Sequence, residues 1–231
     1  MSSMTNTPVI ATASIGSNHI MRLFTTFLLA VLMAVTCTAQ DQVSAFRDFS
    51  FHDGDLVFVI PPTANAITDV TCHTSDVAVD HVAIMHHIGG ENGLPYAIEA
   101  IGKSVCLTPL DSFIVHNNDC QLIVARIPNI DVKRSVRNAL RYVGRPYDDL
   151  FLPTDSEIYC SELVQLSFID ITGNRIFSTI PMSFHDNTGQ ITPYWLEHYA
   201  ARGLKVPEGE PGTNPAQLLQ HTALHIIARF P

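Results

Sequence analysis

The sequence predicts an α+β domain in which an antiparallel sheet packs against a helix that carries a cysteine at its start. Three observations indicate this fold class. The run Leu56–Ile60 is short, apolar and followed by two prolines, which is typical of a buried strand. Two further strand-like runs flank a glycine-rich turn, as in a β-hairpin. An apolar run at helical spacing then begins at Cys160.

The hairpin joins a strand that starts with Asp80 and His81 to a strand that carries Glu99. If its turn is centred near Gly90, His81 lies directly opposite Glu99. Side chains alternate with period two, so a register slip by an even number of residues keeps both on one face. A carboxylate beside an imidazole fixes its tautomer and stabilises its cation. The hairpin therefore supplies a general base and the group that orients it.

The predicted helix that begins at Cys160 is expected to end near Gly173. Free N–H groups and the helix dipole at its N-terminus favour an anion there, and hence a thiolate. Such a thiolate is a nucleophile, and the backbone N–H groups of Cys160 and Ser161 could bind an oxyanion. The alternative is a small buried core cysteine. The nearby pattern of His81 and Glu99 favours the nucleophile.

Two more histidines, His86 and His87, follow His81 and raise the alternative of a metal site that includes a cysteine. Their spacing does not match a closed zinc pattern, and the cysteines are far apart in the sequence. We therefore expect neither a metal nor another cofactor.

The remaining elements are short. Two apolar segments, Val105–Leu107 and Cys120–Ile127, are expected to be strands. A proline at an early helical position, or a capping Asp, Thr or Asn before it, marks the start of each expected helix. These helices cover residues 109–113, 131–143 and 192–203, and a last one runs from Asn214 to the end of the chain. The polar segment 63–79 is expected to form one wall of a cleft.

Residues 1–39 have the pattern of a secretory signal peptide. A short apolar run after Met21 leads to small residues at the cleavage positions, and it is too short for a comfortable membrane span. Met21 is an alternative start of translation, because no Lys or Arg precedes it. We expect export to the periplasm or outside, with a single mature domain over residues 40–231. An uncleaved anchor and lipid attachment at Cys37 are the alternatives.

Export would place the mature chain where disulfides are permitted. Cleavage after residue 39 leaves Cys72, Cys106, Cys120 and Cys160. If Cys160 is the nucleophile it must stay free, so at most one bridge forms among the other three. The sequence does not fix which pair is bridged.

The composition excludes some partners. The chain is 46% hydrophobic and 15% charged, as in globular proteins, and its formal net charge is −9. Binding of phosphate groups needs clustered Lys and Arg, so we expect no nucleic-acid partner. The negative charge gives no electrostatic attraction to an anionic membrane either.

Five short motifs follow one another along the chain: Gly54–Phe58, Asp80–Ile84, Ile98–Ala100, Gly144–Asp148 and Tyr159–Leu163. In this order they resemble the YiiX/YebB-like group of NlpC/P60-type, papain-like cysteine hydrolases. The resemblance runs from about Phe51 to the C-terminus. It implies a papain-like fold with circularly permuted topology.

The resemblance also implies roles for individual residues: Cys160 as nucleophile, His81 as base and Glu99 as third member of the triad. It places Tyr147 in the active-site region, where the hydroxyl could approach the oxyanion. It further suggests that Arg126 lies in the sheet near the site, although a salt-bridged strand end explains that arginine equally well.

The resulting hypothesis is a secreted cysteine hydrolase that cleaves an amide in a cell-wall or other short peptide through an acyl-thioester. Tyr147, Ser161 and Ser75 are the candidate oxyanion or substrate contacts. One alternative is a lipid-directed acyltransferase or deacylase that uses the same triad, with the aromatic residues around Trp195 shaping an acyl pocket. Another is a non-catalytic module that binds a peptide or lipid. The sequence does not indicate an oligomeric state.

Overall fold

The computed structural model describes residues 43–71, 77–90, 92–154 and 156–231. The predicted signal peptide and Cys37 lie outside the described residues, as do Cys72 and Ser75. Within the described part of the chain, none of the helices is both long and apolar enough to span a membrane.

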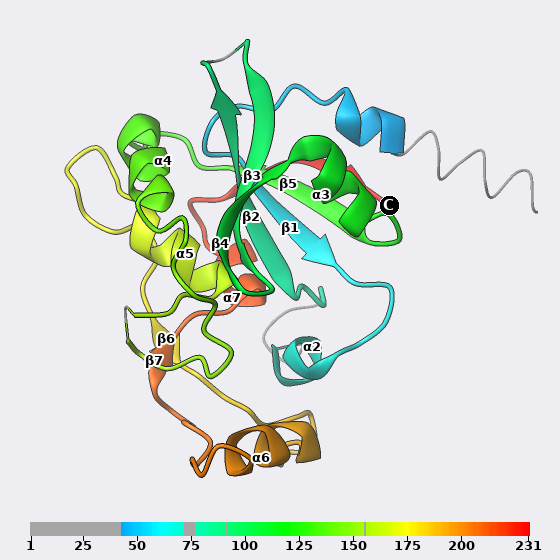
Figure 1. Ribbon diagram of the computed structural model, residues 1–231, viewed down its shortest axis with the longest axis vertical. Helices are drawn as coiled ribbons and strands as arrows, with labels where there is room; N and C mark the ends of the chain where they lie inside the picture. Colours follow the sequence, from blue (N-terminus) through cyan, green and yellow to red (C-terminus); the bar gives the residue numbers. More distant parts are fainter. Residues whose placement is uncertain (1–42, 72–76, 91, 155) are drawn as a thin grey trace, which may run out of the picture. The chain divides into compact units, whose positions relative to one another are not determined.

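A six-stranded antiparallel sheet forms the centre of the domain, with strand order β4-β3-β2-β1-β5-β8 (Figure 1). Its strands are β1 Leu56–Ile60, β2 His81–Ile88, β3 Leu94–Ile101, β4 Ser104–Pro109, β5 Gln121–Arg126 and β8 His225–Phe230. A separate pair joins β6, Ile180–Pro181, to β7, Pro211–Gly212. The fold is therefore α+β with an antiparallel sheet, as predicted.

Helices cover both faces of the sheet (Figure 1). They are α2 Ala66–Thr71, α3 Leu110–His116, α4 Val132–Leu140, α5 Cys160–Ser167, α6 Pro193–Ala200 and α7 Pro215–Leu219. Side chains alternate along β2, so Val82 and Ile84 enter the core with α5, whereas Ala83 and Met85 enter the core with α3. The sheet thus separates two apolar cores, and the cysteine helix belongs to one of them.

The cysteine helix α5 is buried along its whole length, as all eight of its residues are buried. Leu163 and Val164 pack directly into the core with the sheet residues. Burial on all sides fixes the helix axis, and with it the position of Cys160 at the N-terminal end.

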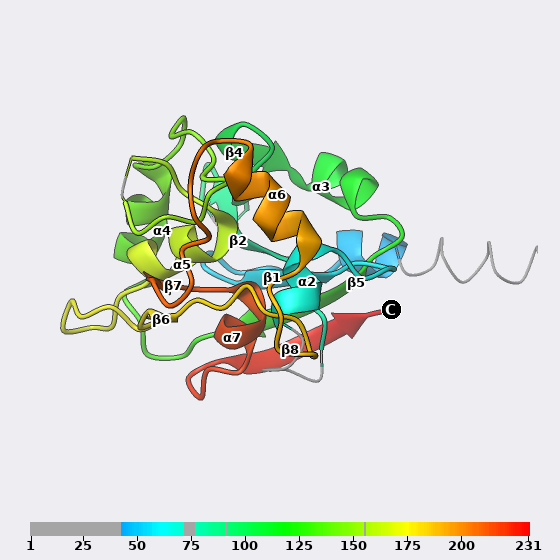
Figure 2. The same cartoon turned by 90° about the horizontal axis from the view of Figure 1, so that it is seen from below.

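A third apolar cluster joins α2, α6 and the loop before α5. Trp195 Nε1 on α6 donates a hydrogen bond to the Ala66 carbonyl on α2 at 3.1 Å, which holds the two helices side by side (Figure 2). The Tyr199 hydroxyl donates to the Leu150 carbonyl. Phe151 has a positive φ of 51° and packs its ring between Tyr159 and Trp195.

Two expectations about the elements are wrong. The chain does not finish in a helix: α7 ends at Leu219, and β8 then pairs with β5. The cysteine helix also ends before Gly173, because Phe168 is already extended and the following Ile169 forms a bridge with Arg175.

The sequence allowed at most one disulfide among the mature cysteines other than Cys160. Cys106, Cys120 and Cys160 are all free thiols. Burial raises the pKa of Cys120 to about 11, and the neighbouring Asp119 carboxylate acts in the same direction. Cys120 therefore carries a neutral thiol at neutral pH.

Candidate active site

His81 and Glu99 form a buried pair, with 2.7 Å between His81 Nε2 and Glu99 Oε2. They are not directly opposite each other, as the sequence led us to expect. Ile84 pairs with Ile98, so the same register places Ala83 across from Glu99. The observed register differs from the expected one by two residues. Because side chains alternate along a strand, His81 and Glu99 still lie on the same face of the sheet.

The charge state of this pair follows from its surroundings. Burial opposes a charge on His81, but hydrogen bonds with Cys160 and Glu99, and the negative charges of both, outweigh it and raise the pKa to about 10. Burial likewise raises the pKa of Glu99, but the hydrogen bond with His81 and the imidazolium charge lower it below its ordinary value. An imidazolium paired with a carboxylate is therefore the form at neutral pH.

Cys160 lies at the N-terminus of α5, and its side chain is close enough to His81 to help raise the pKa of the imidazole. The preceding Tyr159 is extended and gives no side-chain cap to the helix. The first helical bond is donated by Leu163 to the Tyr159 carbonyl at 2.9 Å. The backbone N–H groups of Cys160 and Ser161 consequently have no partner within the helix, and they lie beside the sulfur.

Tyr147 comes from the loop between α4 and α5 and lies near the sulfur. Burial raises its pKa well above the ordinary range, and negative charge on Cys160 and Asp148 adds to the effect. Its hydroxyl thus stays protonated and keeps a donor for a hydrogen bond. The predicted role of Tyr147 at the oxyanion remains a prediction.

Ser161 is fully buried, and its hydroxyl accepts a hydrogen bond from Thr213 Oγ1 at 3.2 Å. The backbone N–H of Thr213 donates to the Tyr159 hydroxyl at 3.0 Å. These two bonds tie the loop before α7 to the start of the cysteine helix. Sequence reasoning missed Thr213, because the loop that carries it is about 50 residues further along the chain than Ser161.

The sequence left two interpretations of Arg126: a residue near the site or a salt-bridged strand end. The structure shows the second. Its Nε and Nη2 donate to the two carboxylate oxygens of Asp55 at 2.6 and 2.8 Å. Asp55 is fully buried and also accepts the His52 backbone N–H at 2.8 Å. The pair joins neighbouring strands β1 and β5 and takes no visible part in the site.

The other two histidines of β2 bind a carboxylate. His86 Nδ1 and His87 Nδ1 lie 3.1 and 3.0 Å from the oxygens of Asp53. Across residues 43–71, 77–90, 92–154 and 156–231, no group of three His, Cys, Asp or Glu side chains is arranged to hold a metal ion.

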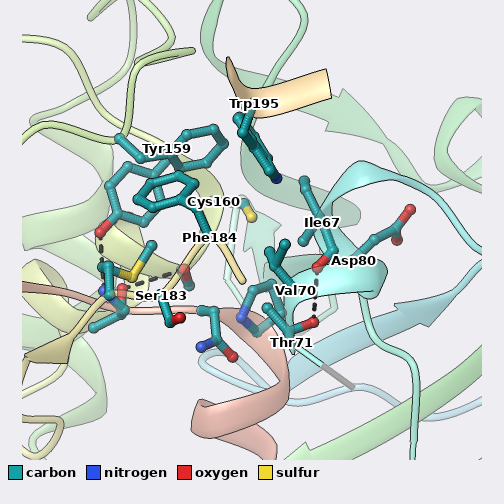
Figure 3. A pocket seen from close by; sticks show the side chains of 15 residues that line it. Ile67, Val70, Thr71, Asp80, Tyr159, Cys160, Ser183, Phe184 and Trp195 are labelled. Carbon is teal, nitrogen blue, oxygen red and sulfur yellow. Dashed lines mark hydrogen bonds between the residues drawn. The ribbon is translucent and has the colours of Figure 1, made fainter. Parts of the chain in front are cut away.

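The sulfur of Cys160 points into a small cavity (Figure 3). Ile67 and Val70 of α2 form one wall, so the segment expected to border a cleft does so at least through α2. A second hollow shares Ile67, Phe151 and Trp195 with the first and extends to Tyr147.

Comparisons with known proteins give the family. The sequence model of the family described as "Permuted papain-like amidase enzyme, YaeF/YiiX, C92 family" matches residues 50–228. The uncharacterized protein YiiX of Escherichia coli strain K12 is 26% identical over 182 residues, which cover 76% of this chain and 85% of that protein. A crystal structure of YiiX from Escherichia coli O157:H7, described there as a metalloprotein, superposes with a TM-score of 0.65 at 23% identity. The superposition covers 79% of this chain and all of that one. The chain is therefore a papain-like cysteine hydrolase, and it belongs to the permuted papain-like amidase family YaeF/YiiX, C92.

Proposed function

We propose that the chain hydrolyses an amide bond with Cys160 as nucleophile, His81 as acid and base, and Glu99 as the group that orients His81. The observation that carries this proposal is the position of His81, which lies 2.7 Å from Glu99 and close to Cys160. The raised pKa of His81, about 10, keeps the imidazole protonated at neutral pH and available as the acid for the leaving amine. Membership of an amidase family supports the choice of an amide.

In this mechanism the Cys160 thiolate attacks the carbonyl carbon, and an electron pair moves to the carbonyl oxygen. The backbone N–H groups at the start of α5 and the Tyr147 hydroxyl stabilise that oxyanion. Glu99 holds Nε2 of His81, so Nδ1 is left to face Cys160 and to protonate the leaving amine. The C–N bond breaks and an acyl-thioester remains. Neutral His81 then takes a proton from water, whose oxygen attacks the thioester and releases the thiolate.

A non-catalytic binding module is the second candidate. It is favoured by the burial of Cys160, which is only 3% exposed, and by the apolar walls of the adjoining cavity. In that case the thiol would be an inert part of a pocket for a peptide or lipid. The two candidates differ in the reactivity of Cys160.

The related Escherichia coli YiiX structure is described as that of a metalloprotein. In this chain the described residues, which do not include 72–76, offer no group of three metal-ligating side chains in suitable positions.

We place the reaction outside the cytoplasm, with residues 1–39 acting as the export signal. The support is the apolar run after Met21 and the small residues before Gln40. The intact mass of the exported protein tests this assignment: a chain that starts at Gln40 is expected, and a retained N-terminus would contradict it.

Alkylation of Cys160 by iodoacetamide across a range of pH tests the catalytic proposal. The wild type should react at pH 6 at least tenfold faster than the His81→Ala variant, since the imidazolium stabilises the thiolate. The matched control is His86→Ala, which removes a histidine of the same strand that binds Asp53 instead. Its rate should equal that of the wild type. Slow alkylation that does not depend on His81 would support the binding module instead.

A further inference from the structure

The cavity beside the sulfur is almost entirely apolar. Figure 3 shows the Cys160 sulfur directed into a space between Ile67, Phe184 and Trp195. Val70 of α2 also lines this space. The hydrophobic effect therefore favours an apolar group in the position adjoining the nucleophile.

The polar side chains around this cavity are engaged within the protein. The Thr71 hydroxyl donates to the Ile67 carbonyl at 3.0 Å, and Ser161 is bound to Thr213. The Asp80 carboxylate accepts from Asn65 at 2.6 Å and turns away from Cys160 (Figure 3). Asn214 caps α7 by accepting the Gln217 N–H at 2.7 Å.

This lining discriminates between two kinds of substrate. A peptide segment in the cavity would bring backbone N–H and C=O groups that need partners, and an unpaired buried polar group is unfavourable. An aliphatic chain brings none. The cavity therefore suits a hydrocarbon chain better than an extended peptide.

The second hollow lies across a shared wall and is also mostly apolar, but its lining includes more polar side chains. Ile67, Phe151 and Trp195 separate the two spaces. Beyond that wall the lining includes Asn65, Tyr147 and Asp149, as well as His198. Tyr147 belongs to this lining and is the proposed partner of the oxyanion. The hollow therefore offers a place for the polar group attached to the reacting carbonyl.

We propose that the substrate is an N-acyl amide whose aliphatic acyl chain occupies the cavity lined by Val70, Phe184 and Trp195, while its amine portion lies in the hollow beside Tyr147. The proposal rests on the proposed function of Cys160. The thiolate bonds to the carbonyl carbon, and the C–N bond breaks as His81 protonates the amine. Water then cleaves the thioester, so the products are a fatty acid and a free amine.

The binding arm of the test uses N-acylglycines from acetyl to decanoyl and the Cys160→Ala variant, which cannot turn over. Calorimetric affinity should rise about three- to fourfold with each added methylene until the cavity is filled. N-acetyl-leucylglycine, which offers an apolar side chain on a peptide backbone, should bind more weakly than N-octanoylglycine. A Kd that does not depend on chain length, or a stronger affinity for the acetyl dipeptide, would overturn the assignment.

Two substitutions test whether the acyl chain of the ligand binds in the cavity. In the Cys160→Ala background, Val70→Phe should lower the ratio of octanoyl to acetyl affinity at least tenfold, since the new ring fills the space. Val115→Phe makes the same change on the exposed surface of α3, where Val115 is 64% exposed, and should leave the ratio unaltered. An unchanged ratio in a folded Val70→Phe protein would remove the cavity from the proposal.

Turnover of the same acylglycines by the wild type tests the function separately. Chain-length-dependent binding with release of glycine supports both proposals. The same binding without glycine release, in a protein whose Cys160 alkylation is independent of His81, would retain the acyl cavity and reject the amidase. Hydrolysis of acetylglycine at the same kcat/KM as octanoylglycine would retain the amidase and reject the acyl cavity.

Discussion

Among single residues, Glu99 has the clearest effect on the site, because its buried carboxylate favours the protonated form of His81. Glu99 is 1% exposed and lies 2.7 Å from the His81 ring. A negative charge so close, with little water to screen it, favours the imidazolium strongly. Glu99 also binds Nε2 of the ring, which leaves Nδ1 as the nitrogen for the proposed proton transfer.

Replacement of Glu99 by Gln should move the alkaline limb of the pH profile. The imidazolium is the acid that protonates the amine, so wild-type kcat/KM should persist as pH rises and fall as His81 loses its proton near pH 10. Glu99→Gln removes the charge, lowers the His81 pKa and shifts that limb to lower pH. At neutral pH, kcat/KM should fall about 10²-fold or more, because the ring loses its orienting partner. Asp53→Asn, which alters the carboxylate beside His86 and His87, is the control and should leave the limb in place.

The sequence predicted the proximity of His81 and Glu99 but not their register. The parity of the residue numbers fixes the face of a strand, whereas the register depends on the turn. Ile88 pairs with Leu94, so the turn is centred one residue beyond Gly90 and the pairing moves by two. Phe184 and Thr213 could not be predicted, because only the tertiary fold brings their loops to α5.

Among the secondary-structure elements, the neighbouring strands β1 and β5 are joined by the Asp55–Arg126 ion pair. Asp55 is fully buried, while the Arg126 side chain is about one-third exposed, at 34%. The arginine satisfies both carboxylate oxygens of Asp55. Loss of the arginine would leave a carboxylate in the core without its strongest partner.

Arg126→Leu should destabilise the protein by about 2–4 kcal/mol, somewhat less than for a fully buried pair because the guanidinium is partly solvated. Urea unfolding measures the difference. The exposed pair Arg47–Asp111 is the matched control, since both of its side chains are at least half exposed, and Arg47→Leu should change stability by less than about 1 kcal/mol. Equal effects of the two substitutions would contradict a structural role for Asp55.

Local patterns predicted elements well where the partners are close in the chain. The hairpin of β2 and β3 and the helix at Cys160 follow from glycines and apolar spacing. The last strand could not be predicted in this way, since His225–Phe230 gains its structure from β5, far earlier in the sequence. Phe168 likewise leaves the helix because the segment after it pairs with more distant residues.

At the scale of the molecule, the described part of the chain has three apolar cores, and the smallest contains the single tryptophan of the sequence, Trp195. Phe151 links this cluster to the start of α5 by packing on Tyr159, with ring centroids 5.0 Å apart. Trp195 is bonded to α2 through Ala66. Because these contacts connect the cluster to the catalytic helix, we expect the cores to unfold together.

Unfolding in urea followed by two probes tests this expectation. Trp195 fluorescence reports the third cluster, and far-UV circular dichroism reports the sheet and helices as a whole. The two transitions should have the same midpoint and slope. A fluorescence midpoint at lower urea would show that α2 and α6 form a separately unfolding unit, and would contradict a single domain over residues 40–231.

The pairing of the last strand has a consequence for the timing of folding. Leu122 of β5 is paired with Phe230 of β8, roughly 100 residues later. At a synthesis rate of roughly 5–20 residues per second, β8 is synthesised about 5–20 s after β5. During that interval β5 presents unpaired N–H and C=O groups, which invite pairing with other chains. The nascent chain is thus most prone to aggregate just before its last strand emerges, after the cysteine helix has been made.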